Sequence, residues 1–129
     1  SATFTPYCYE AMFSGCSSIT TPPYMYNSEV NTGCFKEMFK GCTSLTESPY
    51  LPATSLNTDC YKEMFYGCYN LSTVICLAKT NKDNGCTNWL YDAGRDVTGV
   101  KTFYKNSTTT WGDSSPSTIP EGWTVANYK

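Results

Sequence analysis

A short motif recurs along the chain at a fixed interval, and this periodicity restricts the fold to architectures built from repeated units. The motif reads Cys-Tyr-Glu-Ala-Met-Phe-Ser-Gly-Cys at residues 8–16, and close variants occupy residues 34–42 and 60–68. Corresponding residues are 26 positions apart each time. A period between about 20 and 50 residues indicates supersecondary units that stack and bury each other's apolar sides. We therefore predict a stack of repeats.

A fourth, degenerate copy of the motif begins at Cys86 on the same period. In this copy Leu90 replaces the methionine, Tyr91 replaces the phenylalanine and Gly94 replaces the second cysteine. The linking segments keep the period too, and their residues fall into columns: Ile19, Leu45, Leu71 and Val97; Met25, Leu51, Leu77 and Phe103; Pro23, Pro49 and Ile75. We expect Met12, Met38 and Met64 to be equivalent interior positions.

Each unit divides into two halves with different local preferences. Residues 61–67 predict a short helical turn, which Gly67 can end in the left-handed conformation. Residues 45–51 predict an extended strand, because Pro49 disfavours helix and Pro49-Tyr50-Leu51 alternates inward and outward. A helical turn followed by a strand in a unit of this length is the leucine-rich-repeat layout. The predicted fold is an α/β solenoid, a short stack of such units with a C-terminal β cap.

The period also defines the expected domain organisation. Residues 1–103 form the predicted solenoid, with a half unit at 1–7, units that begin at Cys8, Cys34 and Cys60, and the degenerate unit from Cys86. Residues 104–129 leave the period and form the predicted cap, in which residues 119–125 indicate a turn and a strand. Phe103, Trp111 and Trp123 are suitable covering groups for the core. The N-terminal end shows no such cap, so apolar surface there invites another chain or unit to stack.

Composition excludes several classes of function. The 129 residues suit one domain, and the net charge of −2 with no basic stripe argues against a nucleic-acid partner. No apolar run approaches the roughly 20 residues of a membrane span. The chain has no histidine, the commonest general base, and no nucleotide-binding or nucleophile motif. We therefore predict a protein that is not an enzyme and uses no cofactor.

The eight cysteines indicate an oxidising compartment and structural disulfides. One scheme pairs cysteines within a unit, and we favour it: Cys8–Cys16, Cys34–Cys42, Cys60–Cys68 and Cys76–Cys86. It requires the chain to turn back at the glycines, since eight residues of continuous helix separate two Cα atoms by ~12 Å, whereas a disulfide needs ~4.4–6.8 Å. The competing scheme is a ladder between units, such as Cys8–Cys34 and Cys16–Cys42. The spacings do not match the two to four residues usual between zinc ligands, so no metal is expected.

The outward face of the predicted strands is the candidate ligand-binding face. Tyr24, Tyr50, Cys76 and Thr102 share one column, and Thr20, Thr46, Ser72 and Thr98 share a neighbouring one. Tyrosine rings and hydroxyl groups can contact protein or sugar. These residue types are also good strand formers, which alone would explain their presence. Cys76 in this outward column conflicts with its pairing to Cys86.

The sequence of the units resembles the BspA-like leucine-rich-repeat family, and most closely its cysteine-rich branch. The resemblance rests on Phe-x-Gly-Cys-x-x-Leu-Thr at residues 39–46, on the full unit pattern across residues 34–68, and on Ile-Pro-Glu-Gly-Trp-Thr-Val at 119–125. It implies a gut-type bacterial or phage origin and an extracellular, secreted or surface-attached repeat. Such a repeat would bind protein or glycan on a host or neighbouring cell surface. The alternative is a structural subunit of a filament, pilus or phage tail, assembled end to end through the open N-terminal repeat.

Overall fold

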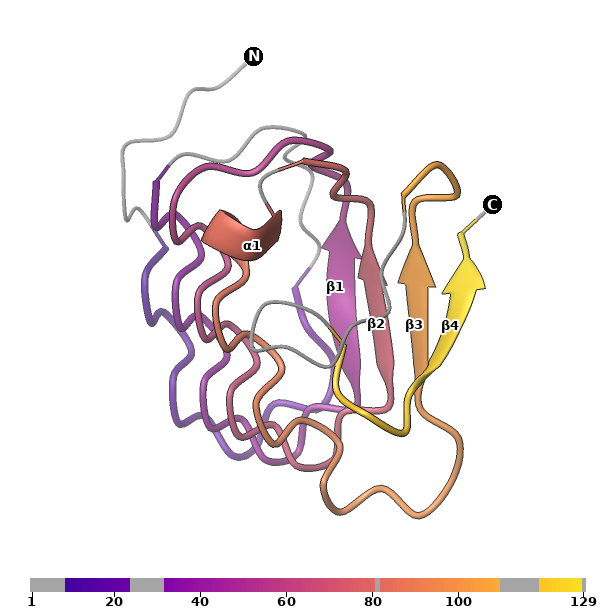
Figure 1. Cartoon of the computed structure of the whole chain (residues 1–129). Helices are drawn as coiled ribbons and strands as arrows, with labels where there is room; N and C mark the ends of the chain where they lie inside the picture. Colours follow the sequence, from indigo (N-terminus) through magenta and orange to yellow (C-terminus); the bar gives the residue numbers. More distant parts are fainter. Residues whose placement is uncertain (1–8, 24–31, 81, 110–118, 129) are drawn as a thin grey trace.

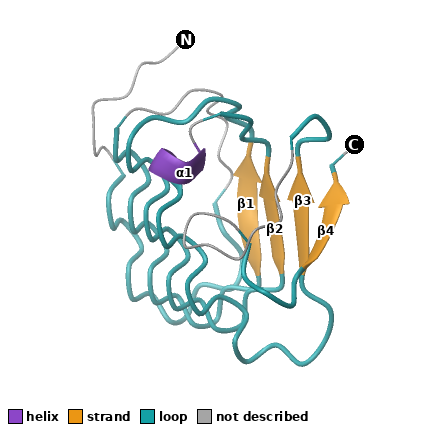
Figure 2. Ribbon diagram, viewed as in Figure 1, coloured by secondary structure: helices purple, strands orange, loops and turns teal. Residues whose placement is uncertain are grey.

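The computed structural model describes residues 9–23, 32–80, 82–109 and 119–128, and a four-stranded parallel sheet is its main element. The strands are β1 (Glu47–Leu51), β2 (Thr73–Cys76), β3 (Thr102–Lys105) and β4 (Thr124–Asn127), and they lie in sequence order (Figures 1 and 2). The only helix in these ranges is the four-residue α1 (Lys82–Gly85). A parallel sheet in sequence order is compatible with the predicted repeat architecture, whereas the predicted helical content is wrong.

β1 and β2 pair with an irregularity that a serine accommodates. Glu47 pairs with Thr73, but Tyr50 pairs with Ile75 and Leu51 with Cys76, so the register shifts by one residue within β1. Ser48 lies at this shift, where its buried hydroxyl accepts a hydrogen bond from the Ile75 N–H at 3.0 Å and donates one to the Pro49 carbonyl at 2.8 Å. The side chain thus satisfies a backbone donor that the irregular ladder would leave without a partner.

The register between β2 and β3 departs from the sequence period. Val74 pairs with Phe103 and Cys76 with Lys105, which is an offset of 29 residues. The extra residues lie in the largely exposed segment 94–101, the loop at the lower right of Figure 1. The predicted column of Leu51, Leu77 and Phe103 is therefore wrong, because Leu51 aligns with Cys76 and Phe103 aligns with Val74.

The motif segments are not helical, because their backbone alternates between two kinds of hydrogen bond. Within the segment at 34–42, the N–H groups of Met38 and Lys40 donate to carbonyls three residues back. The N–H groups that alternate with these donate to carbonyls of the next unit, as Phe39 does to the Met64 carbonyl at 3.0 Å. The chain permits this by taking positive φ at two places in each of the first three motif segments, such as Glu37 (55°) and Gly41 (76°).

Inter-unit spacing explains why these turn segments replace helices. Neighbouring strands of a sheet lie about 4.8 Å apart, whereas packed helices need about 8–10 Å between their axes. The turn segments match the closer spacing, since the rings of Phe13 and Phe39 lie 5.6 Å apart and those of Phe39 and Phe65 lie 5.8 Å apart, both stacked. Helices would separate these rings and break the hydrogen bonds that join the units.

The core lies between the turn segments and the sheet, and burial increases away from the first described unit. Met12, Met38 and Met64 are equivalent in hydrogen bonding, since each donates to the carbonyl three residues back. Their exposed fractions are 57%, 2% and 0%. The predicted interior position is therefore interior in the second and third units only, because no described residue covers Met12.

The fourth unit is shifted by one residue from its sequence alignment. The Phe65 N–H donates to the Trp89 carbonyl, just as Phe39 donates to Met64, so Trp89 takes the place of the methionine and Leu90 that of the phenylalanine. Both are buried, whereas Tyr91, predicted to replace the phenylalanine, is 53% exposed. The Trp89 ring stacks on Tyr61 at 6.1 Å. This contact extends a second column of stacked rings, Tyr9, Phe35 and Tyr61, into the fourth unit.

Residues near the C-terminus close the far end of the core. Phe103, Ile119 and Trp123 are buried, and the Phe103 ring meets the Trp89 ring edge-on at 5.9 Å. β4 forms where the sequence indicated a strand at 119–125, although it starts at Thr124. Trp111 lies outside the described residues. The two ends of the molecule therefore differ, since apolar side chains are covered at one end and partly open at the other.

No disulfide joins the seven described cysteines to one another, so none of the pairs Cys34–Cys42, Cys60–Cys68 and Cys76–Cys86 is formed; Cys8 lies outside the described residues. The thiols follow the columns of the ladder scheme, because Cys68 is near Cys42, and Cys42 is near Cys16. The thiols of Cys42 and Cys68 each donate to a carbonyl of the preceding unit at 3.0 Å. Burial raises the pKa of Cys60, Cys68 and Cys76 to about 12.

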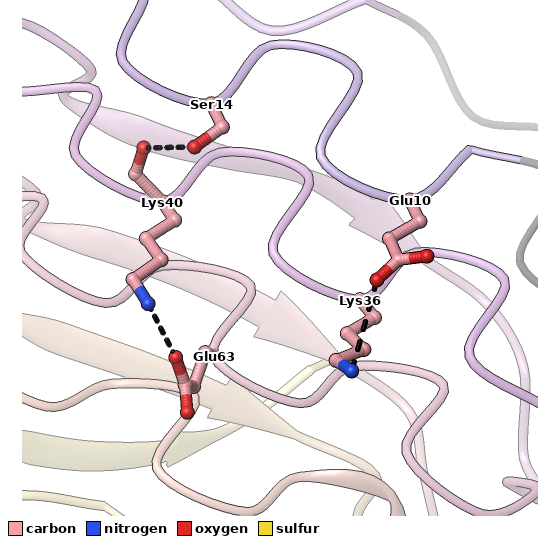
Figure 3. A network of polar contacts seen from close by, with 5 residues as sticks. All are labelled: Glu10, Ser14, Lys36, Lys40 and Glu63. Atoms are coloured by element: carbon pink, nitrogen blue, oxygen red, sulfur yellow. Dashed lines mark hydrogen bonds and ion pairs between the residues drawn. The ribbon is translucent and has the colours of Figure 1, made fainter.

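Polar contacts also join neighbouring turn segments on their outer side. Figure 3 shows Glu10 paired with Lys36 at 3.7 Å, and Lys40 paired with Glu63 at 2.6 Å. The hydrogen bond to Glu63 raises the pKa of Lys40, whose ammonium group also lies 4.8 Å from the centre of the Tyr66 ring. Partly exposed pairs of this kind contribute little individually, about 0–1 kcal/mol.

Candidate binding surface

The four strands present one face to the core and one face away from it. Val74, Cys76 and Phe103 alternate into the core and are fully buried, as expected for residues two apart on a strand. Their neighbours Thr73, Ile75 and Tyr104 point to the opposite face and are half-buried. We call this opposite face the outer sheet face. It is the surface on which the predicted ligand-binding residues were expected.

Two rows of side chains cross the outer sheet face perpendicular to the strands. The register aligns Glu47, Thr73, Thr102 and Thr124 in the first row and Tyr50, Ile75, Tyr104 and Ala126 in the second. The first row supplies hydroxyl groups on three successive strands. The second supplies aromatic and aliphatic surface. Donors and acceptors therefore lie directly beside an apolar strip.

The aromatic strip extends across the sheet. Tyr50 belongs to β1, whereas Tyr128 follows β4 at the other edge, yet the centres of their rings are 5.5 Å apart. The two side chains must lean toward each other over the intervening strands, because neighbouring strands are about 4.8 Å apart. Tyr128 keeps 38% of its surface exposed. Tyr50, Tyr104 and Tyr128 thus concentrate aromatic area on one side of the molecule.

A second line of hydroxyl residues approaches the sheet from the turn side. The Thr46 N–H and hydroxyl both donate to the Thr20 carbonyl at 3.4 Å, and the Ser72 N–H and hydroxyl both donate to the Thr46 carbonyl, at 2.9 and 3.2 Å. These hydroxyls are occupied in joining the units. Thr20 and Thr46 are nevertheless exposed, and Thr46 directly precedes β1.

The structure brings together only part of the predicted binding residues. Tyr50 and Thr102 lie on the outer sheet face, in different rows. Thr98 is exposed in the segment 94–101 and no described hydrogen bond joins it to Thr46 or Ser72. Tyr24 lies outside the described residues. The placement of Cys76 on the outer face is wrong, because the shift beside Ser48 turns it into the core opposite Leu51.

Four residues of the outer sheet face were not predicted from the sequence: Thr73, Tyr104, Thr124 and Tyr128. The 26-residue period assigned Thr102 to the column of Tyr50, whereas the true offset pairs Thr102 with Thr73. The alternation in Thr102-Phe103-Tyr104 did carry a usable signal, since a buried Phe103 places both of its neighbours outward. Nothing in the period indicated that residues 124–128 would join the same face.

The outer sheet face has the chemistry of a contact surface. Glu47 is the only charged residue in its two rows. In the described part of the chain, no group of three or more cysteine or acidic side chains could hold a metal ion. None of the helices described is long and apolar enough to cross a membrane. The face offers aromatic area and hydroxyl groups, which suit recognition of a neutral, hydroxyl-rich or peptide ligand.

Comparison of the chain with protein-family models, with curated proteins and with solved structures finds no match in any of the three.

Proposed function

We propose that this protein is a non-catalytic, extracellular or surface-attached repeat module that binds protein or glycan through the outer sheet face. The observation that carries the proposal is the strip of Tyr50, Tyr104 and Tyr128 beside a row of threonine hydroxyls. Tyrosine provides a large contact area with little loss of side-chain entropy, and it presents a hydroxyl group at its tip. Sugar rings and extended peptides both match this combination of flat apolar and hydrogen-bonding surface.

The repeat architecture supports a role in binding. Stacked units that contact only their neighbours form an extended, rigid surface, and the predicted leucine-rich-repeat-like solenoid would present such a surface. The resemblance to BspA-like surface proteins supports the same role and an adhesive function on a host or neighbouring cell. The parallel sheet in sequence order and the hydrogen bonds between successive units are consistent with this assignment.

Binding to a glycan array and to immobilised mucosal glycoproteins would test the proposal. We expect Tyr104→Ser to weaken binding at least about tenfold, equivalent to roughly 1.4 kcal/mol. Tyr91→Ser is the matched control, because Tyr91 is also exposed but lies on a turn segment, away from the sheet. Absence of binding by the native chain, or equal losses in the two variants, would contradict the proposal.

A structural role is the second candidate, and one observation favours it. The first described unit leaves Met12 exposed and Phe13 half-buried, although the same positions are buried in later units. A subunit of a filament, pilus or phage tail would bury this end against a neighbour. Sedimentation of the native chain over a range of concentrations tests the idea, and a strict monomer throughout would remove self-association through this end.

A further inference from the structure

Backbone hydrogen bonds between the first three turn segments run in one direction only. The carbonyls of Lys36, Met38 and Lys40 accept from N–H groups of the preceding unit at 2.8, 2.9 and 2.7 Å. The carbonyls of Lys62, Met64 and Tyr66 accept from the unit before them in the same way, at 2.8, 3.0 and 2.8 Å. In both cases the earlier unit supplies the backbone donors and the later unit supplies the acceptors. The direction follows from the alternating backbone, which aims every second N–H group along the stack.

The first described unit therefore ends in a row of acceptors. Its equivalent carbonyls belong to Glu10, Met12 and Ser14, and no backbone N–H among the described residues donates to them. Figure 3 shows that the side chains of Glu10 and Ser14 reach to the following unit, toward Lys36 and Lys40. These contacts lie on one side of the segment, and the carbonyl row lies on the other.

Apolar side chains accompany the carbonyl row. Met12 is exposed, and Phe13, Cys16 and Ile19 are half-buried, while their counterparts in the next two units are fully buried. The unit also carries less charge, since Ala11 and Ser14 stand where the second unit has glutamate and lysine. A surface with open acceptors, exposed apolar groups and low charge has the features of a covered interface.

We propose that this end is an interaction surface for one further turn segment of the same kind, supplied by another stretch of polypeptide. Its alternate N–H groups would donate to the carbonyls of Glu10, Met12 and Ser14, and its apolar side chains would cover Met12 and Phe13. The last turn segment of a second copy is a poor donor, because Leu90 is buried and the Trp123 ring lies close to Gly94. The inference concerns the same end of the molecule as the structural alternative above but names a different occupant, and it is independent of binding at the outer sheet face.

An extended chain tests the proposal directly. One additional copy of residues 33–58 is inserted between Pro6 and Tyr7, which keeps the 26-residue period. The measured quantity is the rate at which hydrogen peroxide oxidises Met12, followed by peptide mass spectrometry, with Met64 as the internal standard. We expect the Met12 rate to fall at least tenfold, toward that of Met64, because the added segment would bury it. The matched control is the same insertion with M38E and F39E in the added copy, which should leave the Met12 rate as in the native chain.

Each other outcome overturns the proposal. An unchanged Met12 rate in the extended chain means that the end does not accept a turn segment. A raised Met64 rate means that the added unit disrupts the stack. Concentration-dependent protection of Met12 in the native chain, together with sedimentation as a dimer, assigns the surface to a second copy. None of these results affects ligand binding measured with Tyr104→Ser, so failures of the two proposals are distinguishable.

Discussion

At the scale of single residues, the cysteines show how strongly tertiary context decides chemistry. Their number indicated disulfides, yet no disulfide joins the described cysteines to one another, and six of the seven are buried in the core. A thiol buried among apolar groups stays protonated, because the thiolate would lose its hydration. This is the cause of the pKa of about 12 for Cys60, Cys68 and Cys76. Such thiols act as small apolar side chains, and their reactivity is suppressed.

We predict that these buried thiols do not react with Ellman's reagent at pH 8 in the native state, while half-buried Cys16 reacts. In guanidinium chloride all eight cysteines should react. A chain in which the predicted within-unit disulfides had formed would release no thiol even when unfolded. That result would contradict the free-thiol structure and would support the oxidised form expected from sequence.

The same thiols make stability depend on pH. Their pKa rises from 9.0 in the unfolded chain to about 12 in the folded one. Their contribution to stability is therefore complete below pH 9 and is lost as the pH rises from 9 to 12, since the unfolded state then releases protons that the folded state retains. Guanidinium titrations across this window should show falling free energies of unfolding, and a constant value would contradict the assignment.

At the scale of elements, the turn segments depend on positions with positive φ. Glycine takes these angles without strain, and Gly67 and Gly94 share the same φ of 75°. Their surroundings differ. A Cβ at Gly67 would meet only backbone atoms of Gly41, at 3.8 and 3.9 Å, whereas one at Gly94 would lie 2.8 Å from the Leu71 carbonyl and 2.6 Å from the Lys101 side chain.

Alanine substitutions at these two glycines should separate the cost of the backbone conformation from the cost of close packing. Gly67→Ala should cost about 1–2 kcal/mol, the conformational cost alone. Gly94→Ala should cost about 1–3 kcal/mol more, because the carbonyl and the nearby Trp123 ring must move. Chemical denaturation of the two variants measures both costs. Equal losses would mean that the close packing around Gly94 does not exist in solution.

At the scale of the whole molecule, equivalent positions contribute differently to the free energy of unfolding, because the units occupy different places in the stack. Met12 and Met64 hold the same place in their units, but one is 57% exposed and the other fully buried. Met64→Ala should lower the free energy of unfolding by about 2–5 kcal/mol through loss of burial and creation of a cavity. Met12→Ala should change it by less than about 0.5 kcal/mol. Similar losses at both positions, measured by denaturation, would show that Met12 is covered in solution.

The sequence by itself determined the repeat, its period and most of the core. Identical spacing of the motifs carried this information, because units that stack must place the same side chains against each other. The repeated apolar positions of the second and third units are buried, as expected from the sequence: Met38, Phe39, Met64 and Phe65. Phe103, expected from the sequence to cover the core, is likewise buried. These features are local or periodic, so no knowledge of distant contacts was needed.

Only the tertiary structure decided the form of the turn segments and the register of the strands. Local preferences favoured a helical turn, but hydrogen bonds between units and ring spacings of 5.6 and 5.8 Å impose a flatter conformation. The serine at the irregularity in β1 moved Cys76 into the core, and the longer segment before β3 changed the offset to 29 residues. A one-residue change in register exchanges the two faces of a strand, so the composition of the outer sheet face was fixed by pairing and not by period.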